Sequence, residues 1–188
     1  MYIFFDWVSS EWYIALVDTN KDIIASDNFQ ISWNESTQTI PIIDEFLTAQ
    51  KVNYTDIENI MCVAGPWSFT WIRTISLVVN TLAYTYKNIK LTSVNFFDLY
   101  DTYPIVKSSS KRDLFVKYSK SDIIQVLSNT DFENLREDNH IYWDTNCDRF
   151  TKDISISQKI DYQKVIKNIA ITDTSKIAPL YIKKPNIS

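Results

Sequence analysis

Residues 57–73 read IENIMCVAGPWSFTWIR, and together with residues 74–94 they give the clearest indication of a fold in this chain. The apolar run 57–63 predicts a buried strand that ends at a Gly-Pro turn. Ser68 is a good N-cap residue and apolar residues recur at helical spacing behind it, so we predict a helix over 68–86. A strand at 89–94 comes next. This order predicts two parallel strands joined by a crossover.

The residues before this unit predict three further strands and one helix. The strands are expected at 2–6, at 13–17 and at about 21–29, with short polar connections that indicate an antiparallel meander. Apolar residues at helical spacing predict an amphipathic helix over 36–50. We therefore predict an α/β fold, with a mixed sheet flanked by helices over residues 1–103.

The chain after residue 103 is less regular, and we predict a second, reduced α/β domain over residues 104–188. No internal repeat is visible there. The expected elements are strands at 113–118 and 140–142, helices at 121–127 and 161–169, a polar link at 129–139 and an extended tail at 178–182.

The composition limits the classes of function. The chain has 188 residues, of which 45% are hydrophobic, and a net charge of −4 with a pI near 5.0, so strong general binding of nucleic acid is not expected. The start has no basic segment and no apolar run is long enough to span a bilayer, which predicts a soluble, cytoplasmic protein. Cys62 and Cys147 have no metal-type spacing and are expected to be free thiols.

Glycine is almost absent. Gly65 is the single glycine, where average usage predicts around a dozen, whereas there are six tryptophans. Glycine supplies positive φ in turns, and an α/β domain of this length normally needs several such positions. The shortage therefore calls for an explanation.

The segment 63–73 resembles the signature of the TsaB family, a Gly-Pro-Gly-Ser-Phe-Thr-Gly-Leu-Arg run, with Trp67 and Trp71 where the family has glycine. Asp6 and Ala15-Leu16 keep the family's spacing at the first strand turn, although Trp7-Val8 replaces a Thr-Ser pair. Weaker similarities lie at 35–47, where Glu35 replaces a family histidine, at 141–144, where Trp143 stands for glycine, and at 179–183.

The resemblance implies an actin-like (ribonuclease H-like) fold and a non-catalytic subunit. TsaB pairs through helices with the catalytic subunit TsaD, together with the ATPase TsaE, in threonylcarbamoyladenosine modification of tRNA next to the anticodon, so contact with tRNA would be indirect. Both predicted helices of the first domain also carry more apolar residues than one buried stripe requires, which suggests docking, unless the chain's own second domain covers them. The predicted partner-binding residues are Ile40, Ile43, Phe46, Leu47, Ser68, Phe69, Ile72, Arg73, Ile75, Ser76 and Val79.

Three tryptophans at family glycine positions, Trp67, Trp71 and Trp143, suggest that the gene uses UGA for glycine and was translated with a table that reads it as tryptophan. The physical argument is that an indole in a turn that needs positive φ or close packing is unfavourable, whereas glycine fits. The alternative is a family member with genuine indoles in its turns. The six codons decide between them.

Catalytic residues are not expected. His140 is the single histidine, so the paired-histidine metal site of TsaD is impossible within this chain. Ser9, Ser68 and Cys62 have no recognisable base beside them, and Ser68 has a sufficient role as a helix cap.

A nucleotide is the one cofactor that the sequence leaves open. The turn at Gly65 and Ser68 delivers backbone amides at a helix N-terminus, and Asp6 and Ser9 lie at the hairpin that grips phosphate in actin-like folds, although the spacing is not that of a Walker loop. The alternatives to the partner subunit are therefore a nucleotide-binding kinase or hydrolase of this fold and a homodimeric interaction module.

Overall fold

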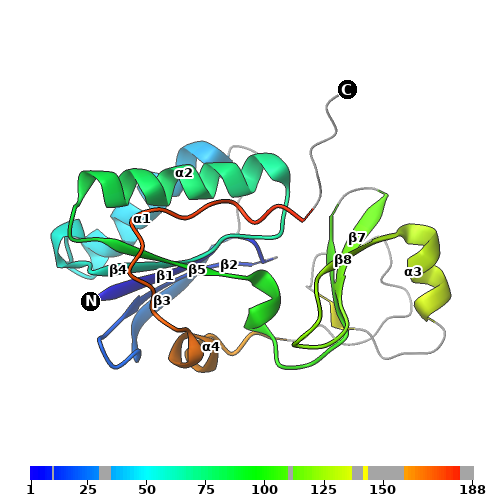
Figure 1. Cartoon of the computed structure of the whole chain (residues 1–188). Coiled ribbons are helices and arrows are strands. Elements are labelled where there is room, and N and C mark those ends of the chain that lie inside the picture. Colours follow the sequence, from blue (N-terminus) through cyan, green and yellow to red (C-terminus); the bar gives the residue numbers. More distant parts are fainter. Residues whose placement is uncertain (10, 30–34, 110–111, 137–141, 144–158, 183–188) are drawn as a thin grey trace.

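The computed structural model describes residues 1–9, 11–29, 35–109, 112–136, 142–143 and 159–182. Two sheets lie side by side, and the larger one carries the two longest helices (Figure 1). None of the described helices is long and apolar enough to cross a bilayer.

The first sheet has five strands in the order β3-β2-β1-β4-β5. β1 pairs antiparallel with β2 and parallel with β4, β2 pairs antiparallel with β3, and β4 pairs parallel with β5, so the predicted meander and crossover are confirmed. The strands are β1 (Tyr2–Asp6), β2 (Trp12–Val17), β3 (Ile23–Phe29), β4 (Asn59–Val63) and β5 (Lys90–Val94).

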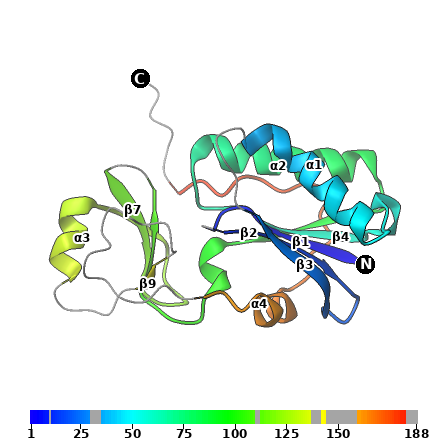
Figure 2. The same ribbon diagram turned by 180° about the vertical axis from the view of Figure 1, so that it is seen from behind.

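Helices cover both faces of this sheet. α1 (Glu35–Ala49) and α2 (Phe69–Thr85) lie next to each other on one face, and α4 (Tyr162–Asn168) lies on the other (Figures 1 and 2). All three helices lie within a residue or two of their predicted positions. Ser68 is the N-cap of α2, as predicted, because its side chain accepts a hydrogen bond from the Trp71 amide. Two 3₁₀ turns, η1 (Tyr54–Asp56) and η2 (Phe96–Leu99), follow α1 and β5.

The second sheet has the order β8-β7-β6-β9, and its core is a small cluster around Phe132. The predicted helix at 121–127 is wrong, because residues 125–128 pair antiparallel with β7. A helix lies within residues 129–139, for which only a polar link was predicted. A strand that begins at residue 105 was not predicted. The elements are β6 (Ile105–Ser108), β7 (Asp113–Lys117), β8 (Gln125–Ser128), α3 (Asn129–Arg136) and β9 (Tyr142–Trp143).

The described residues test one further prediction for this part of the chain only in part, and they leave another untested. Residue 142 of the predicted strand 140–142 belongs to β9, whereas residues 140 and 141 lie outside the described residues. The division of the chain at residue 103 stays a prediction.

The C-terminal segment returns to the first sheet. Thr174 forms a bridge to Leu91 of the edge strand β5, and the Leu91 amide donates to the Thr174 carbonyl at 2.7 Å. Further along, Asn80 of α2 exchanges two hydrogen bonds with the backbone of Ile177, and the Leu180 amide donates to the Ala64 carbonyl. Figure 1 shows this segment crossing β5 and then running beside α2. It therefore covers an edge that would otherwise offer unpaired backbone groups.

Candidate functional site

The turn after β1 is built around the buried carboxylate of Asp6. One oxygen accepts the backbone amides of Val8 and Ser9, each at 3.0 Å, and the other accepts the Ser9 hydroxyl and the Tyr162 hydroxyl, the latter at 2.8 Å. Burial raises the pKa of Asp6, and these hydrogen bonds act in the opposite direction. The Val8 and Ser9 amides of the predicted phosphate-gripping turn are thus directed at the chain's own carboxylate.

A buried lysine from the second sheet completes this turn. Lys107 of β6 is fully buried, and its ammonium group donates to the Val8 carbonyl at 2.7 Å. The same nitrogen lies 4.0 Å from the ring centre of Trp67 and 3.9 Å from that of Phe96, so two aromatic faces surround the charge. Lys107 therefore ties the second sheet to the first turn of the first sheet.

The second turn with predicted amide donors begins at Gly65, whose φ is +125°. A Cβ atom on this residue would lie 3.2 Å from the Leu180 carbonyl oxygen and 3.3 Å from the Ile72 Cγ2 atom, so the turn is closely packed and needs glycine. The Trp71 indole nitrogen donates to the Trp7 carbonyl at 2.7 Å and brings this turn against the Asp6 turn. Asp6, Ser9, Gly65 and Ser68 therefore belong to two neighbouring turns, as the nucleotide hypothesis requires, but nucleotide binding itself stays a prediction.

Three indoles fill the space between these turns. Trp12 stacks on Trp71 with ring centres 4.7 Å apart and lies 5.8 Å from Trp7, and all three side chains are buried. Among the described residues, Lys21 and Lys51 are the non-glycine residues with positive φ. Trp67 and Trp71 thus have backbone conformations that suit any residue, so the turn-conformation argument for glycine is wrong at these two positions. The recoding hypothesis then depends on the codons and on whether glycine packs better than the indole at these positions.

The described residues show no grouping of catalytic type. No three of their histidine, cysteine, aspartate or glutamate side chains come close enough together to hold a metal ion. Burial raises the pKa of the Cys62 thiol, which therefore stays protonated and is a poor nucleophile. His140 and Cys147 lie outside the described residues.

Most of the predicted partner-binding residues lie inside the chain's own core. The apolar side chains among them are packed in the protein interior, so they do not form an exposed surface. The buried members are Ile43, Phe46, Leu47, Ile72, Ile75, Ser76 and Val79, Phe69 is half-buried, and Ile40, Ser68 and Arg73 are exposed. Partner binding by these residues stays a prediction.

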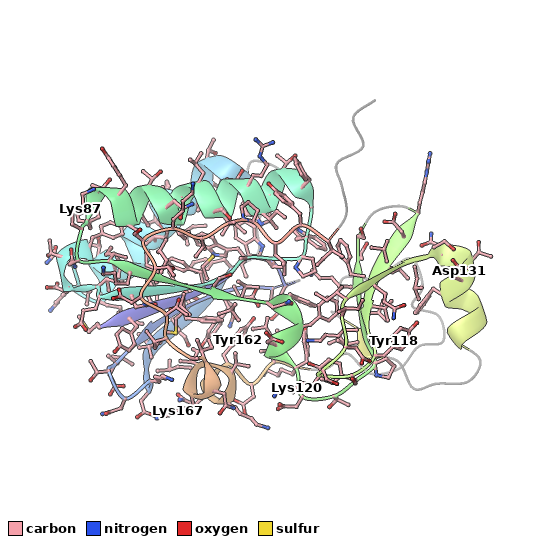
Figure 3. All side chains as sticks on the ribbon, viewed as in Figure 1. Lys87, Tyr118, Lys120, Asp131, Tyr162 and Lys167 are labelled. Atoms are coloured by element: carbon pink, nitrogen blue, oxygen red, sulfur yellow. The ribbon has the colours of Figure 1, made fainter. Side chains whose placement is uncertain are left out.

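α2 also has an outward face, which includes one of these predicted residues, and we call Arg73, Leu77 and Tyr84 the outer face of α2. Leu77 is 68% exposed and Tyr84 is 75% exposed, which makes them two of the most exposed large apolar residues described. Cations flank this face, because the Arg73 guanidinium lies 5.3 Å from the Phe69 ring centre and the Lys87 ammonium 3.9 Å from that of Tyr84. Figure 3 shows Lys87 beyond the end of α2. Neither Leu77 nor Tyr84 is among the partner-binding residues predicted from the sequence.

A five-stranded mixed sheet with β1 at its centre, helices on both faces and a second, smaller sheet define an actin-like α/β fold. This confirms the predicted fold class. No protein-family model matches the chain, and no curated protein matches it by sequence.

Two solved structures from Pseudomonas aeruginosa share the fold. One is YeaZ, also called TsaB, with a TM-score of 0.58 and 14% identity over 68% of this chain and 66% of that one. The other is described as an uncharacterized protein with similarity to the peptidase YeaZ, with a TM-score of 0.61 and 13% identity over 76% of this chain and 74% of that one. The match thus spans just under two thirds of the first protein's length. At this identity the likeness shows the fold alone, which is TsaB-like.

Proposed function

We propose that this chain is a non-catalytic, TsaB-like partner subunit that binds and activates a TsaD-like enzyme in threonylcarbamoyladenosine modification of tRNA. A TsaE-like ATPase belongs to the same cytoplasmic assembly, and tRNA is contacted only indirectly. The observation that carries the proposal is the outer face of α2, an exposed apolar helix surface on a TsaB-like fold.

The outer face of α2 has the chemistry of a docking surface. Arg73, Leu77 and Tyr84 recur at intervals that place them on one side of the helix. Tyrosine and arginine are enriched at the centres of protein interfaces and among the residues that contribute most of the binding energy. Half-buried Phe69 extends this face, and its ring stacks on that of Tyr181 from the C-terminal segment at 4.8 Å.

The geometry of the Asp6 turn supports a role without catalysis. The Asp6 carboxylate occupies the amides of Val8 and Ser9, and Lys107 occupies the carbonyl between them. A phosphate would have to displace these buried contacts. A nucleotide-binding kinase or hydrolase of the same fold is the alternative, and tight binding of magnesium-ATP in a calorimetric titration would favour it.

Size-exclusion light scattering with the TsaD-like protein of the same source tests the proposal. We expect a stable one-to-one complex, and the double variant Leu77→Asp/Tyr84→Asp should abolish it, because it places two carboxylates in an apolar contact. Ile123→Asp is the matched control, since Ile123 is 80% exposed and lies next to the second sheet. Its complex should be unchanged.

Two results would contradict the proposal. Separate peaks at concentrations well above micromolar would show that the two proteins do not associate with useful affinity. A stable homodimer that ignores the TsaD-like protein and dissociates in the double variant would instead indicate the homodimeric module.

A further inference from the structure

A pocket of about 330 Å³ lies on the α4 side of the first sheet, away from the outer face of α2. It is bounded by the end of β5, by η2, by α4 and by the chain between β7 and β8. Lys120, which is labelled in Figure 3, is one of the residues that line the pocket. Its volume is near the lower end of the range for ligand pockets, roughly 300–1,000 Å³, which favours a small ligand.

One side of the pocket is apolar. Val94 and Leu99 are buried residues of the first sheet and η2, and half-buried Val165 and Ile169 come from α4 and its C-cap. These four side chains form a surface that would accept an aliphatic or aromatic group.

The rest of the lining is charged, with both signs close together. Asp98 and Asp101 come from η2 and the residues after it, Lys120 from the connection before β8, and Lys164 from α4. The Lys164 ammonium lies 2.6 Å from Asp101 Oδ2, and Asp98 Oδ1 lies 3.4 Å from the ammonium of Lys117. The hydrogen bond and charge of Lys164, with a further effect from Lys120, lower the pKa of Asp101, so its carboxylate stays charged at neutral pH.

We propose that this pocket binds a small zwitterion with an apolar side chain, of the amino-acid class. The ligand carboxylate pairs with Lys120 and Lys164, its ammonium pairs with Asp98 and Asp101, and its side chain contacts the apolar side. A dianion would meet two carboxylates and a simple cation would meet two ammonium groups, so neither matches the lining.

The ion pair between Lys164 and Asp101 does not oppose this arrangement. Both side chains are 57% exposed, and an exposed ion pair contributes little to stability. A zwitterion entering between them gives each charge a new partner of the opposite sign. The proposal is independent of the partner-subunit role, because the pocket and the outer face of α2 lie on opposite sides of the sheet.

Titration of the whole chain with L-leucine, followed by amide chemical shifts in NMR spectra, tests the proposal. We expect saturable shifts in α4, η2 and the end of β5. Leucinamide lacks the carboxylate and 4-methylpentanoate lacks the ammonium, so each should bind about tenfold or more weakly than leucine.

Two variants remove one charge of each sign. Asp98→Asn and Lys164→Met should each weaken leucine binding about tenfold, whereas Lys167→Met should leave it within about twofold. Lys167 is the matched control because it lies on the same helix, pairs with Asp22 at 2.6 Å and does not line the pocket.

The proposal is overturned if leucine gives no saturable shift up to about 50 mM, or if all three small molecules bind equally. Equal leucine binding by the two pocket variants and the unaltered chain would also overturn it. The comparison of the three molecules uses the unaltered chain, so it decides the matter even if a variant fails to fold.

Discussion

Replacing Trp71 with glycine tests whether the indoles between the two turns belong to the fold. Trp71 is buried in the first turn of α2, stacks on Trp12 with ring centres 4.7 Å apart, and donates from its indole nitrogen to the Trp7 carbonyl at 2.7 Å. Glycine at this position removes the stacking partner, leaves a cavity against the sheet and leaves a buried carbonyl without this donor.

The expected loss is large. Removing a buried tryptophan side chain down to alanine costs about 3–5 kcal/mol, and alanine to glycine inside a helix costs about 1 kcal/mol more. The free energy of unfolding should therefore fall by about 4–6 kcal/mol, which is comparable with the whole stability of many domains, about 5–15 kcal/mol. With a denaturant slope of about 2–3 kcal/mol/M, the urea midpoint should fall by about 2 M.

Urea unfolding followed by circular dichroism measures this loss without relying on tryptophan fluorescence. Leu77→Gly is the matched control, because Leu77 lies on the same helix but points to solvent, and it should lose only about 1 kcal/mol. If Trp71→Gly matches or exceeds the midpoint of the unaltered chain, the packing argument fails and the position is one that glycine fits. That result, together with a UGA codon at residue 71, would support recoding.

Two further changes test the turns directly. Gly65→Ala should lower the free energy of unfolding by about 1–3 kcal/mol, because φ at +125° is strained for alanine and its Cβ would press on the Leu180 carbonyl; an unchanged urea midpoint would contradict this. Asp6→Asn should alter the pH dependence of stability. Because the folded pKa of Asp6 is raised above its ordinary value of 3.8, its contribution is full below that value and is lost as the pH rises through the raised pKa. Urea midpoints from about pH 4 to about pH 8 should therefore fall less steeply in the variant than in the unaltered chain, and parallel profiles would show that Asp6 does not titrate there.

The first sheet could be predicted from the sequence because its signals are local. Its strands are short apolar runs, and α2 begins at a recognisable N-cap, Ser68. The second sheet could not. Ile123, Ile124 and Leu127 have a spacing that also suits a helix, but residues 125–128 join β7 through pairings that no local pattern encodes. α3 is short and mostly polar in sequence, although Ser128 is an N-cap residue type that could have indicated it, and in the structure its hydroxyl accepts a hydrogen bond from the Asp131 amide.

At the candidate site, even less of the observed arrangement could be predicted from the sequence. Asp6 and Ser9 could be predicted from the resemblance to actin-like folds, and Gly65 and Ser68 from the Gly-Pro turn and the helix cap that follows it. Their actual partners come from far along the chain: the Tyr162 hydroxyl on Asp6 is 156 residues away, and the Lys107 ammonium is 99 residues from Val8. Helical spacing could identify apolar residues on α1 and α2, but periodicity alone does not tell a buried stripe from a second, exposed one. Hence the core residues were predicted as partner contacts.

Lys107 and Tyr162 together change what the Asp6 turn can do. In an actin-like fold this hairpin has its amides available for phosphate, but here Asp6 accepts the amides of Val8 and Ser9, and Lys107 holds the carbonyl between them. Tyr162 of α4 donates a hydrogen bond to the same Asp6 carboxylate, so residues from the second sheet and from α4 both hold the turn in place. A turn held in this way joins two sheets and a helix into one unit, and two of the surfaces that this unit presents are the outer face of α2 and the charged pocket beside α4. We therefore expect the activity of this chain to lie in what these two surfaces bind rather than in chemistry at the turn.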